Sequence, residues 1–430
     1  MRTFLTIWLG QLGSNLGSRM TSFTMTLWAW DLTQQATALA LVGFFIQLPQ
    51  MLATPFTGVI VDRYSRKQLM LAGDAVAALS TLVLLGLYTN GQLQIWHIYG
   101  AGAINGMFGQ LQQLAYTASM TLMVPEHHYS RALSLNFLSA YGANIVGPAI
   151  AGALYPLVGL TGILLVDLGT FAIAALALFS ATIPQPPAPD TPLTLRKDLA
   201  VGFHYLVQRP GMVSILVTAA LFQFIFQITS ALHAPMILAR SGGSAQVLAT
   251  VYATAGIGGV LGAILITTWG GPRPRIYGVL LGMIGAGVSR AGFSVGHSLT
   301  LWMPMQFCLS FNFPIMGSSG NAIWLSKVPP DLQGRVFSIS LLIKGLMSPM
   351  GRLVAGPLAD RIFEPAMMPG GRLVPIFGTL FGTGRGAGMA TLCGIASLAM
   401  TLVGLCGFLY QPLRTVETTL PDHKATHSQP

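Results

Sequence analysis

Apolar stretches of about 20 residues recur along almost the whole chain, from Phe4 to Tyr410, with only short polar breaks between them. A helix of about 20 apolar residues is long enough to cross the roughly 30 Å hydrocarbon layer of a bilayer. Backbone groups cannot stay unpaired in lipid, so each stretch is expected to be a helix. The sequence therefore predicts an integral membrane protein built of α-helices.

The charged residues are too few to cover the surface of a water-soluble protein of 430 residues. Only 8% of the residues are charged and 53% are hydrophobic, whereas about a quarter of residues in soluble domains are charged. The net charge of +10 could suggest nucleic-acid binding. Lys and Arg placed beside apolar spans are more simply explained by the cytoplasmic bias of membrane proteins. We therefore expect the lipid bilayer, and no nucleic acid, as a partner.

The apolar stretches predict twelve transmembrane helices, arranged as two groups of six. Between the groups, a proline-rich segment cannot continue a helix, and the pattern of Leu, Phe, Tyr and Val after Pro192 predicts a short amphipathic helix on the membrane. The predicted spans are residues 4–30, 36–60, 69–89, 95–121, 131–157, 160–182, 211–238, 246–268, 275–294, 298–326, 335–361 and 386–410.

These spans predict four regions of the chain. We expect an N-terminal six-helix bundle over residues 1–182, a cytoplasmic linker over 183–210, a C-terminal six-helix bundle over 211–410 and a disordered cytoplasmic tail over 411–430. Most of the 22 Lys and Arg residues fall in the loops on the side of the amino terminus. The positive-inside rule then places both termini in the cytoplasm and the insertion at 363–385 outside. Short outer loops are consistent with a bacterial inner membrane.

The two halves of the chain contain an internal repeat. The segment VPEHHYSRALSL at Val124–Leu135 aligns without a gap with VPPDLQGRVFSI at Val328–Ile339. A parallel repeat of six helices is typical of transporters in which two bundles move about a site near the middle of the membrane. Further along the same alignment, Gly147, Gly152 and Leu154 match Gly351, Gly356 and Leu358.

The segment GVIVDRYSRK, between the second and third spans, concentrates charge in an apolar chain. With this segment the sequence resembles the major facilitator superfamily, whose loop signature is matched by Gly58, Asp62, Arg63, Arg66 and Lys67. A Gly-Pro step followed by small residues in the fifth span is typical of the superfamily's exporters. The segment YGANIVGPAIAGAL supplies this step with Gly142, Gly147, Pro148 and Gly152.

Within the superfamily, the chain is most similar to the macrolide-efflux and enterobactin-exporter branch, of the drug:proton antiporter type. Similar segments are IWLGQ, VDRYSRKQLMLAGD, LLVDLGT, LQGRVFS and LADRI. The resemblance implies a monomeric secondary transporter, not an enzyme and without a cofactor, which exports a small amphiphilic drug, siderophore or peptide natural product by proton antiport. An importer or facilitator on the same scaffold is the alternative, and a non-transporting membrane scaffold protein is a remote one.

The charged loop suggests a gate. An ionised Asp62 needs hydrogen-bond donors, and the amino end of a helix supplies them together with a favourable dipole. The resemblance implies that this loop docks on the start of the eleventh span, near Arg335. The other interpretation is a topology anchor whose basic residues contact anionic lipid. The matching loop of the second half, residues 270–275, keeps basic residues but has no acid.

Three cations lie deep inside predicted spans, far from either end: Arg19, Lys344 and Arg352. A charge in the middle of a bilayer is costly, so it normally faces a cavity or a partner. One hypothesis is a cationic part of the cavity that favours an acid-bearing substrate. The alternative is internal pairing with an acid of the spans.

Proton coupling is implied by the resemblance, because no GxxxxGK[ST] loop for a nucleotide is present. The acids in or beside the spans are Asp31, Asp74 and Asp167. The resemblance implies that the third and sixth spans, which carry Asp74 and Asp167, are peripheral to the cavity. The spans that it implies to line the cavity carry amides that contact either substrate or neighbouring helices: Gln11, Asn15, Asn105, Gln110, Gln113, Gln223, Gln227 and Asn312. We expect no metal site.

Overall fold

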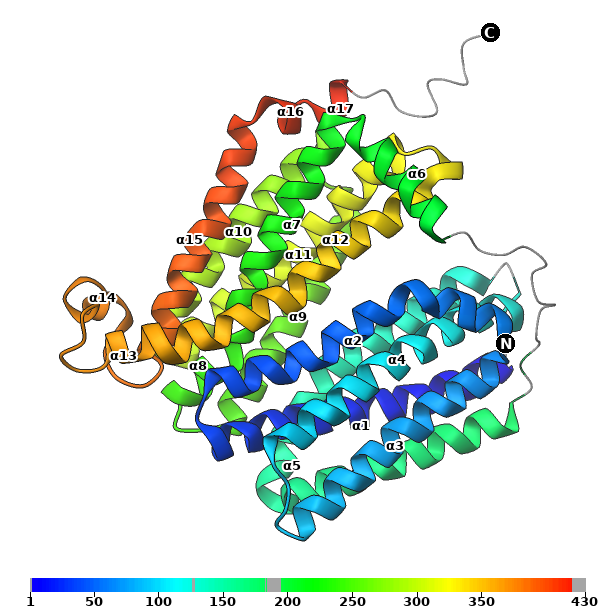
Figure 1. The fold of residues 1–430 in the computed structure, drawn as a ribbon, viewed down its shortest axis with the longest axis horizontal. Coiled ribbons are helices and arrows are strands. Elements are labelled where there is room, and N and C mark those ends of the chain that lie inside the picture. The colour runs from blue at the N-terminus through cyan, green and yellow to red at the C-terminus, as the bar shows by residue number, and fades with distance from the viewer. Residues whose placement is uncertain (1, 126–127, 182, 184–194, 420–430) are drawn as a thin grey trace. The chain divides into compact units, whose positions relative to one another are not determined.

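The computed structural model describes residues 2–125, 128–181, 183 and 195–419, and the regular structure of these residues is helical, without a strand (Figure 1). The helices of the N-terminal half are α1 (Arg2–Thr33), α2 (Ala36–Arg63), α3 (Arg66–Thr89), α4 (Ile95–Met123) and α5 (Tyr129–Ser180). Those that follow are α6 (Leu195–Val207), α7 (Pro210–Ala231), α8 (His233–Arg240), α9 (Ala245–Trp269), α10 (Arg275–Val295), α11 (Leu299–Lys327), α12 (Pro330–Leu358), a π-helical turn (Ala359–Phe363), α13 (Glu364–Met367), α14 (Val374–Phe381), α15 (Ala387–Leu409), α16 (Gln411–Arg414) and α17 (Val416–Thr419).

The described parts of all twelve predicted spans are helical except for a few residues, and this confirms the all-α membrane class. The exceptions are Ala181, Leu232, Ser298, Gly386 and Tyr410. Within the described part of the chain, eight helices are long and apolar enough to cross a membrane by length and composition. One of them, Gly142–Ser180, covers most of the fifth and sixth predicted spans. Helices α1, α4 and α11 are also long, but they carry amides, and α1 and α11 also carry charged residues, which reduce their apolar character. The count of twelve spans stays a prediction.

Helix α5 continues through Pro148 and Pro156 and breaks at Gly159. The backbone of Gly159 has φ 63° and ψ −169°, a conformation that glycine adopts without the steric cost of a Cβ atom. This break lies between the fifth and sixth predicted spans. The chain therefore turns at the glycine, and helical structure is kept at both prolines.

The amphipathic helix predicted after Pro192 is observed as α6, and it packs on α12. The Tyr205 hydroxyl donates to the carbonyl of Lys327 at 3.1 Å, and a Cβ atom on Gly202 would lie 2.6 Å from the carbonyl oxygen of Arg335. The glycine thus lets the backbones of α6 and α12 approach each other closely.

The predicted disordered tail is wrong for residues 411–419, which form α16 and α17. Leu413 and Val416 are buried, and the Glu417 carboxylate accepts a hydrogen bond from the backbone N–H of Ile276 at 2.8 Å. Apolar burial and this bond to the first turn of α10 explain the order. Residues 420–430 of the predicted tail lie outside the described residues.

The contacts divide the chain into two compact units, each with its own core. Unit 1 comprises Met1–Gln34, Leu41–Leu193 and Gly243–Ala253, and unit 2 comprises Gln35–Ala40, Thr194–Gly242 and Thr254–Pro430. In unit 1, α5 packs along α1 and α3, and α3 packs on α4, as Figure 1 shows. In unit 2, α10 packs on α11 and α15, while α7 packs on α12 and α15. The predicted division at residues 183–210 stays a prediction.

The start of α2 folds with unit 2, and the reason is an acid at the end of α12. The Asp360 carboxylate accepts hydrogen bonds from the backbone N–H groups of Ala36 at 3.0 Å and Thr37 at 2.7 Å. A Cβ atom on Gly356 would lie 2.5 Å from the Cα atom of Thr37. Asp360 therefore caps the first turn of α2, and Gly356 makes room for it.

The glycines matched by the internal repeat make equivalent close contacts. A Cβ atom on Gly147 would lie 2.6 Å from the Cβ atom of Arg19 on α1, and one on Gly351 would lie 2.8 Å from the Cβ atom of Gln227 on α7. Each of these glycines lets a helix of its own unit approach the first long helix of that unit. The repeat in sequence is therefore also a repeat in packing.

Candidate functional site

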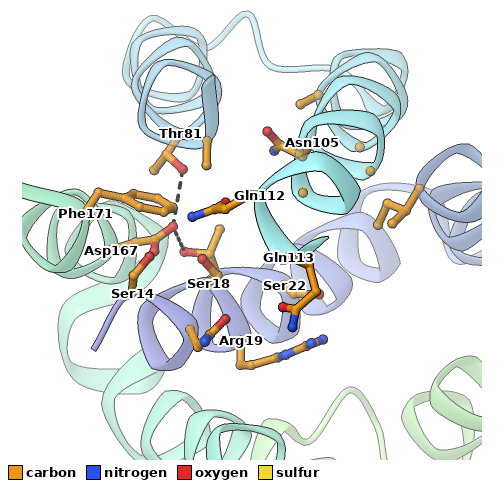
Figure 2. A pocket seen from close by; sticks show the side chains of 18 of the residues that line it. Ser14, Ser18, Arg19, Ser22, Thr81, Asn105, Gln112, Gln113, Asp167 and Phe171 are labelled. Carbon is orange, nitrogen blue, oxygen red and sulfur yellow. Dashed lines mark hydrogen bonds between the residues drawn. The ribbon is translucent and has the colours of Figure 1, made fainter. Parts of the chain in front are cut away.

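Unit 1 contains a cavity of about 470 Å³, shown in Figure 2. Side chains from α1 to α5 line it, and many carry hydroxyl or amide groups, including Ser14, Ser18, Ser22 and Gln112. Apolar side chains such as Phe171 and Ile46 form other parts of the wall. The volume lies within the range typical of small-ligand pockets. The cavity can therefore accept a molecule with both polar and apolar parts.

Asp167, on the second part of α5, reaches the wall of this cavity and is 1% exposed. The hydroxyl groups of Thr21 and Thr81 donate to its Oδ2 at 2.8 and 3.3 Å, the two bonds drawn in Figure 2. Its Oδ1 is buried and has no hydrogen-bond partner among the described residues. A Cβ atom on Gly17 would lie 2.7 Å from this oxygen, so the glycine makes room for it. Asp167 thus lines this cavity of unit 1, and the expectation that it is peripheral to the transport cavity stays a prediction.

Asp74, on α3, is also buried, but both of its oxygens accept hydrogen bonds. Gln112 Nε2 donates to Oδ1 at 2.6 Å, and Gln11 Nε2 donates to Oδ2 at 3.1 Å. Gln112 Nε2 also lies 3.3 Å from Gln11 Oε1. Asp74 therefore connects α1, α3 and α4 through a bonded network.

Arg19 lines the same cavity from α1, and Figure 2 shows its side chain extending away from Asp167. Within the described part of the chain, its guanidinium makes no hydrogen bond or ion pair. The alternative of internal pairing with Asp74 or Asp167 is not observed, because the bonds of these acids go to amides and hydroxyls. The base of the side chain packs closely against Gly147.

The predicted cavity residues divide between the two units. Gln11, Asn15, Arg19, Asn105 and Gln113 line the cavity of unit 1. Gln110 lies outside this lining and accepts a hydrogen bond from Gln50. Asp31 lies at the exposed end of α1. The remaining predicted residues belong to unit 2: Gln223, Gln227, Asn312, Lys344 and Arg352.

Of the four residues that donate to the two buried acids, sequence reasoning named only Gln11 and missed Gln112, Thr21 and Thr81. A buried acid needs donors, but the sequence does not say which of several nearby amides and hydroxyls faces it. Arg290 is a further buried cation that the sequence analysis did not single out. It is 3% exposed within α10, and its guanidinium lies 2.7 Å from both His233 Nδ1 and the Thr229 carbonyl oxygen.

The predicted gating loop is held by its basic residues. Arg66 Nη1 donates to the carbonyl of Ala118 at 2.6 Å, and Lys67 Nζ donates to the carbonyls of Phe179 and Ala181 at 2.9 and 2.7 Å. These bonds satisfy carbonyl groups near the ends of α4 and α5, where a cation is also favoured by the helix dipole. Asp62 makes no hydrogen bond or ion pair with a described residue. The gating role stays a prediction.

Gly147, in the Gly-Pro step of α5, and Gly142, five residues before it, allow a matched test of helix packing. We expect Gly147→Ala to lower the free energy of unfolding by about 1 to 3 kcal/mol, because the added methyl group would meet the Cβ atom of Arg19 at 2.6 Å. Gly142→Ala is the control, because a Cβ atom there meets nothing within 4 Å. Thermal unfolding of the purified variants in one detergent measures the difference. Equal stability of the two variants contradicts the packing argument.

A family model described as Major Facilitator Superfamily matches residues 7–351. Macrolide efflux protein A of Streptococcus pyogenes is 24% identical over 367 residues, covering 84% of this chain and 90% of that protein. The multidrug efflux pump Tap of Mycolicibacterium fortuitum is 24% identical over 330 residues, covering 73% of this chain and 78% of that protein.

Solved transporter structures have the same fold. A bacterial homologue of the human lysosomal transporter Spinster, in an inward-facing and unoccupied conformation, matches with a TM-score of 0.72 at 14% identity and covers 98% of both chains. The nucleoside transporter NupG matches with a TM-score of 0.69 at 12% identity, covering 94% of this chain and 98% of the other. At these identities the similarity concerns the fold.

Proposed function

The chain belongs to the Major Facilitator Superfamily, and we propose that it exports a small amphiphilic molecule across the bacterial inner membrane in exchange for protons. It is a membrane transporter and not an enzyme. Export is supported by the relatives named as efflux proteins and by the Gly-Pro step of α5. In the proposal, two six-helix bundles alternate access to the cavity, as is general for transporters with a parallel repeat.

The observation that carries the proton coupling is the environment of Asp167. Its Oδ2 is held by two hydroxyl groups, while its buried Oδ1 has no donor among the described residues. A carboxylate without enough donors in an apolar setting is costly, and a proton on Oδ1 removes this cost. When the site opens to water, the acid can ionise and the two threonines stabilise the charge. Asp167 can therefore take up a proton and release it again.

The other two acids fit this role less well. Both oxygens of Asp74 accept amide N–H groups, so this carboxylate is already held by donors, whereas Oδ1 of Asp167 has no donor among the described residues. Asp31 is exposed at the end of α1, where its charge needs no neutralisation. We therefore assign the coupling proton to Asp167 and a structural role to Asp74.

Transport direction is tested in everted membrane vesicles that contain the protein. We expect erythromycin or the acidic dye 8-anilinonaphthalene-1-sulfonate to accumulate only when the vesicle interior is acidic. Vesicles from cells without the gene are the control. Gradient-driven uptake of the same compounds by whole cells supports the importer instead, and accumulation that ignores the pH gradient contradicts antiport.

A further inference from the structure

We propose that Arg19 binds an acidic group of the transported molecule, such as a carboxylate, sulfonate or phosphate. This inference rests on the proposed function, since it names the chemical class of its substrate. It starts from a cation that lines the cavity of unit 1 and makes no hydrogen bond or ion pair with any residue that the structure describes. A cation in a membrane helix normally faces a cavity or a partner. Arg19 is exposed at this cavity and has no partner among the described residues, so an anion from outside the protein would be stabilising there.

The helix packing holds this cation in place. Gly147 lies against the Cβ atom of Arg19, and the carbonyl oxygen of Leu16 is 3.5 Å from the position of a Cβ atom on Gly147. Because α5 therefore lies directly on this turn of α1, the base of the Arg19 side chain cannot swing toward α5. The Gly-Pro step of α5 thus positions a guanidinium at the cavity, which is a specific link between this motif and the substrate.

The surroundings of Arg19 also fit an amphiphilic acid. Asn15, Ser18, Ser22 and Gln113 supply polar groups on the same cavity, and Figure 2 shows the labelled Ser22 and Gln113 on the side of Arg19 that lies away from Asp167. A guanidinium forms two parallel hydrogen bonds with a planar carboxylate, which an ammonium group cannot reproduce. Apolar side chains of the cavity wall, such as Ile46 and Phe171, would contact the apolar part of the transported molecule.

Two dyes with the same aromatic frame test the proposal by equilibrium binding. The purified full-length protein in lipid nanodiscs is titrated with 8-anilinonaphthalene-1-sulfonate and with the neutral N-phenyl-1-naphthylamine, and empty nanodiscs correct for partitioning. We expect the wild-type protein to bind the sulfonate more tightly. Arg19→Gln should weaken sulfonate binding about tenfold or more and leave the neutral dye unchanged, while Arg19→Lys keeps part of the preference. Equal affinity of the wild type for both dyes, or an equal loss for both in Arg19→Gln, overturns the proposal.

Failure of the Arg19 proposal in the dye-binding experiment can be told apart from failure of the proposed proton antiport. The binding experiment has no proton gradient, so a dye preference that depends on Arg19 can be present even when transport does not respond to pH. Conversely, proton-driven transport without any dye preference contradicts only the role of Arg19. Gly142→Ala serves as the matched variant that should leave both dyes unchanged, because its methyl group meets nothing within 4 Å.

A different observation supports a second inference: we infer that Asp360 holds the start of α2 through hydrogen bonds that can break and re-form. This contact is called the catch below. Residues Gln35–Ala40 fold with unit 2, whereas α2 from Leu41 onward folds with unit 1. The catch consists of two hydrogen bonds to the backbone of Ala36 and Thr37, with the negative carboxylate at the positive end of the helix dipole. Any movement of the main part of α2 relative to unit 2 must break these bonds or bend the helix.

The catch is present on one side of the repeat only. In the repeat alignment Gly356 matches Gly152, and a Cβ atom on Gly152 would lie 2.6 Å from the Cβ atom of Ala249 in the first turns of α9. Four residues after Gly356 the chain has Asp360, whereas four residues after Gly152 it has Pro156. Gly152 and Gly356 thus each pack against the first turns of another helix. Only the contact of Gly356 with α2 is strengthened by hydrogen bonds to an acid.

Neighbouring Glu364 provides a matched control for this acid. Its carboxylate accepts hydrogen bonds from the backbone N–H groups of Gly386 at 3.2 Å and Met389 at 2.8 Å. It therefore caps α15, which lies entirely within unit 2. Loss of Glu364 should loosen unit 2 locally, whereas loss of Asp360 should free the start of α2.

The catch is tested by labelling a cysteine at Ala38, which is 5% exposed. Ala38→Cys is made in a protein whose two exposed cysteines, Cys308 and Cys406, are replaced by Ser. In detergent, Asp360→Asn is expected to raise the rate of maleimide labelling on the order of tenfold, and Glu364→Gln to leave it unchanged. An unchanged rate in Asp360→Asn, or the same increase in both variants, overturns the inference.

Discussion

Replacing Asp167 by Asn is expected to abolish proton-driven accumulation of substrate and to leave exchange of substrate down its own gradient intact. The amide cannot release or bind the coupling proton, yet it keeps the size of the carboxyl group and can still accept bonds from Thr21 and Thr81 at its oxygen. Proteoliposomes with an imposed pH gradient measure accumulation, and counterflow without a gradient measures exchange. We expect accumulation in the variant to fall to the level of protein-free liposomes.

Two further variants show whether this effect belongs to the proton site. Asp74→Asn should lower stability by about 1 to 3 kcal/mol, because the amides of Gln11 and Gln112 lose their charged acceptor, and should retain coupling in the folded fraction. Gly17→Ala should impair coupling and also lower stability, because its methyl group would press on the Thr170 hydroxyl group and on Oδ1 of Asp167, the latter at 2.7 Å. Normal gradient-driven accumulation by Asp167→Asn contradicts the assignment of the proton to this residue.

Replacing Asp62 by Asn is expected to leave membrane insertion and thermal stability unchanged and to reduce transport about five- to thirtyfold. Asp62 makes no hydrogen bond or ion pair with a described residue in this conformation, so its charge is not needed for the fold seen here. Its predicted partner is the start of α12 near Arg335, where a carboxylate gains from a helix amino end. We expect each transport cycle to pass through this contact between Asp62 and the amino end of α12. The contact contributes roughly 1 to 2 kcal/mol, and its loss in the variant would slow each turnover.

The basic residues of the same loop supply the contrast. Arg66→Gln is expected to lower thermal stability, because the guanidinium donates to the carbonyl of Ala118 at 2.6 Å and this partly buried charge-assisted bond would be lost. Quantitative membrane fractions and thermal unfolding separate the two effects. Normal transport by a well-expressed Asp62→Asn variant rules out the gating role, whatever Arg66→Gln shows.

The helical class and most helix limits could be predicted from the sequence, because the bilayer imposes its demand on each stretch separately. The turn between the fifth and sixth predicted spans lies at Gly159, where the backbone needs a positive φ. The prediction failed at residues 411–419, since the order there comes from contacts with α10 and α11 that are distant in the chain. The helix cap that Glu417 provides for Ile276 has no local signal in the sequence.

Asp74 and Asp167 show what the sequence by itself determined and what only the tertiary structure decided. In the sequence, each is a single acid in an apolar span, and the cost of burying a charge is enough to mark both as unusual. Their difference depends on which groups on other helices face them: amides on both oxygens of Asp74, and hydroxyls on one oxygen of Asp167. Hydropathy acts along the chain and specifies the helices, whereas the rotation and packing of each helix select the partners of its polar side chains.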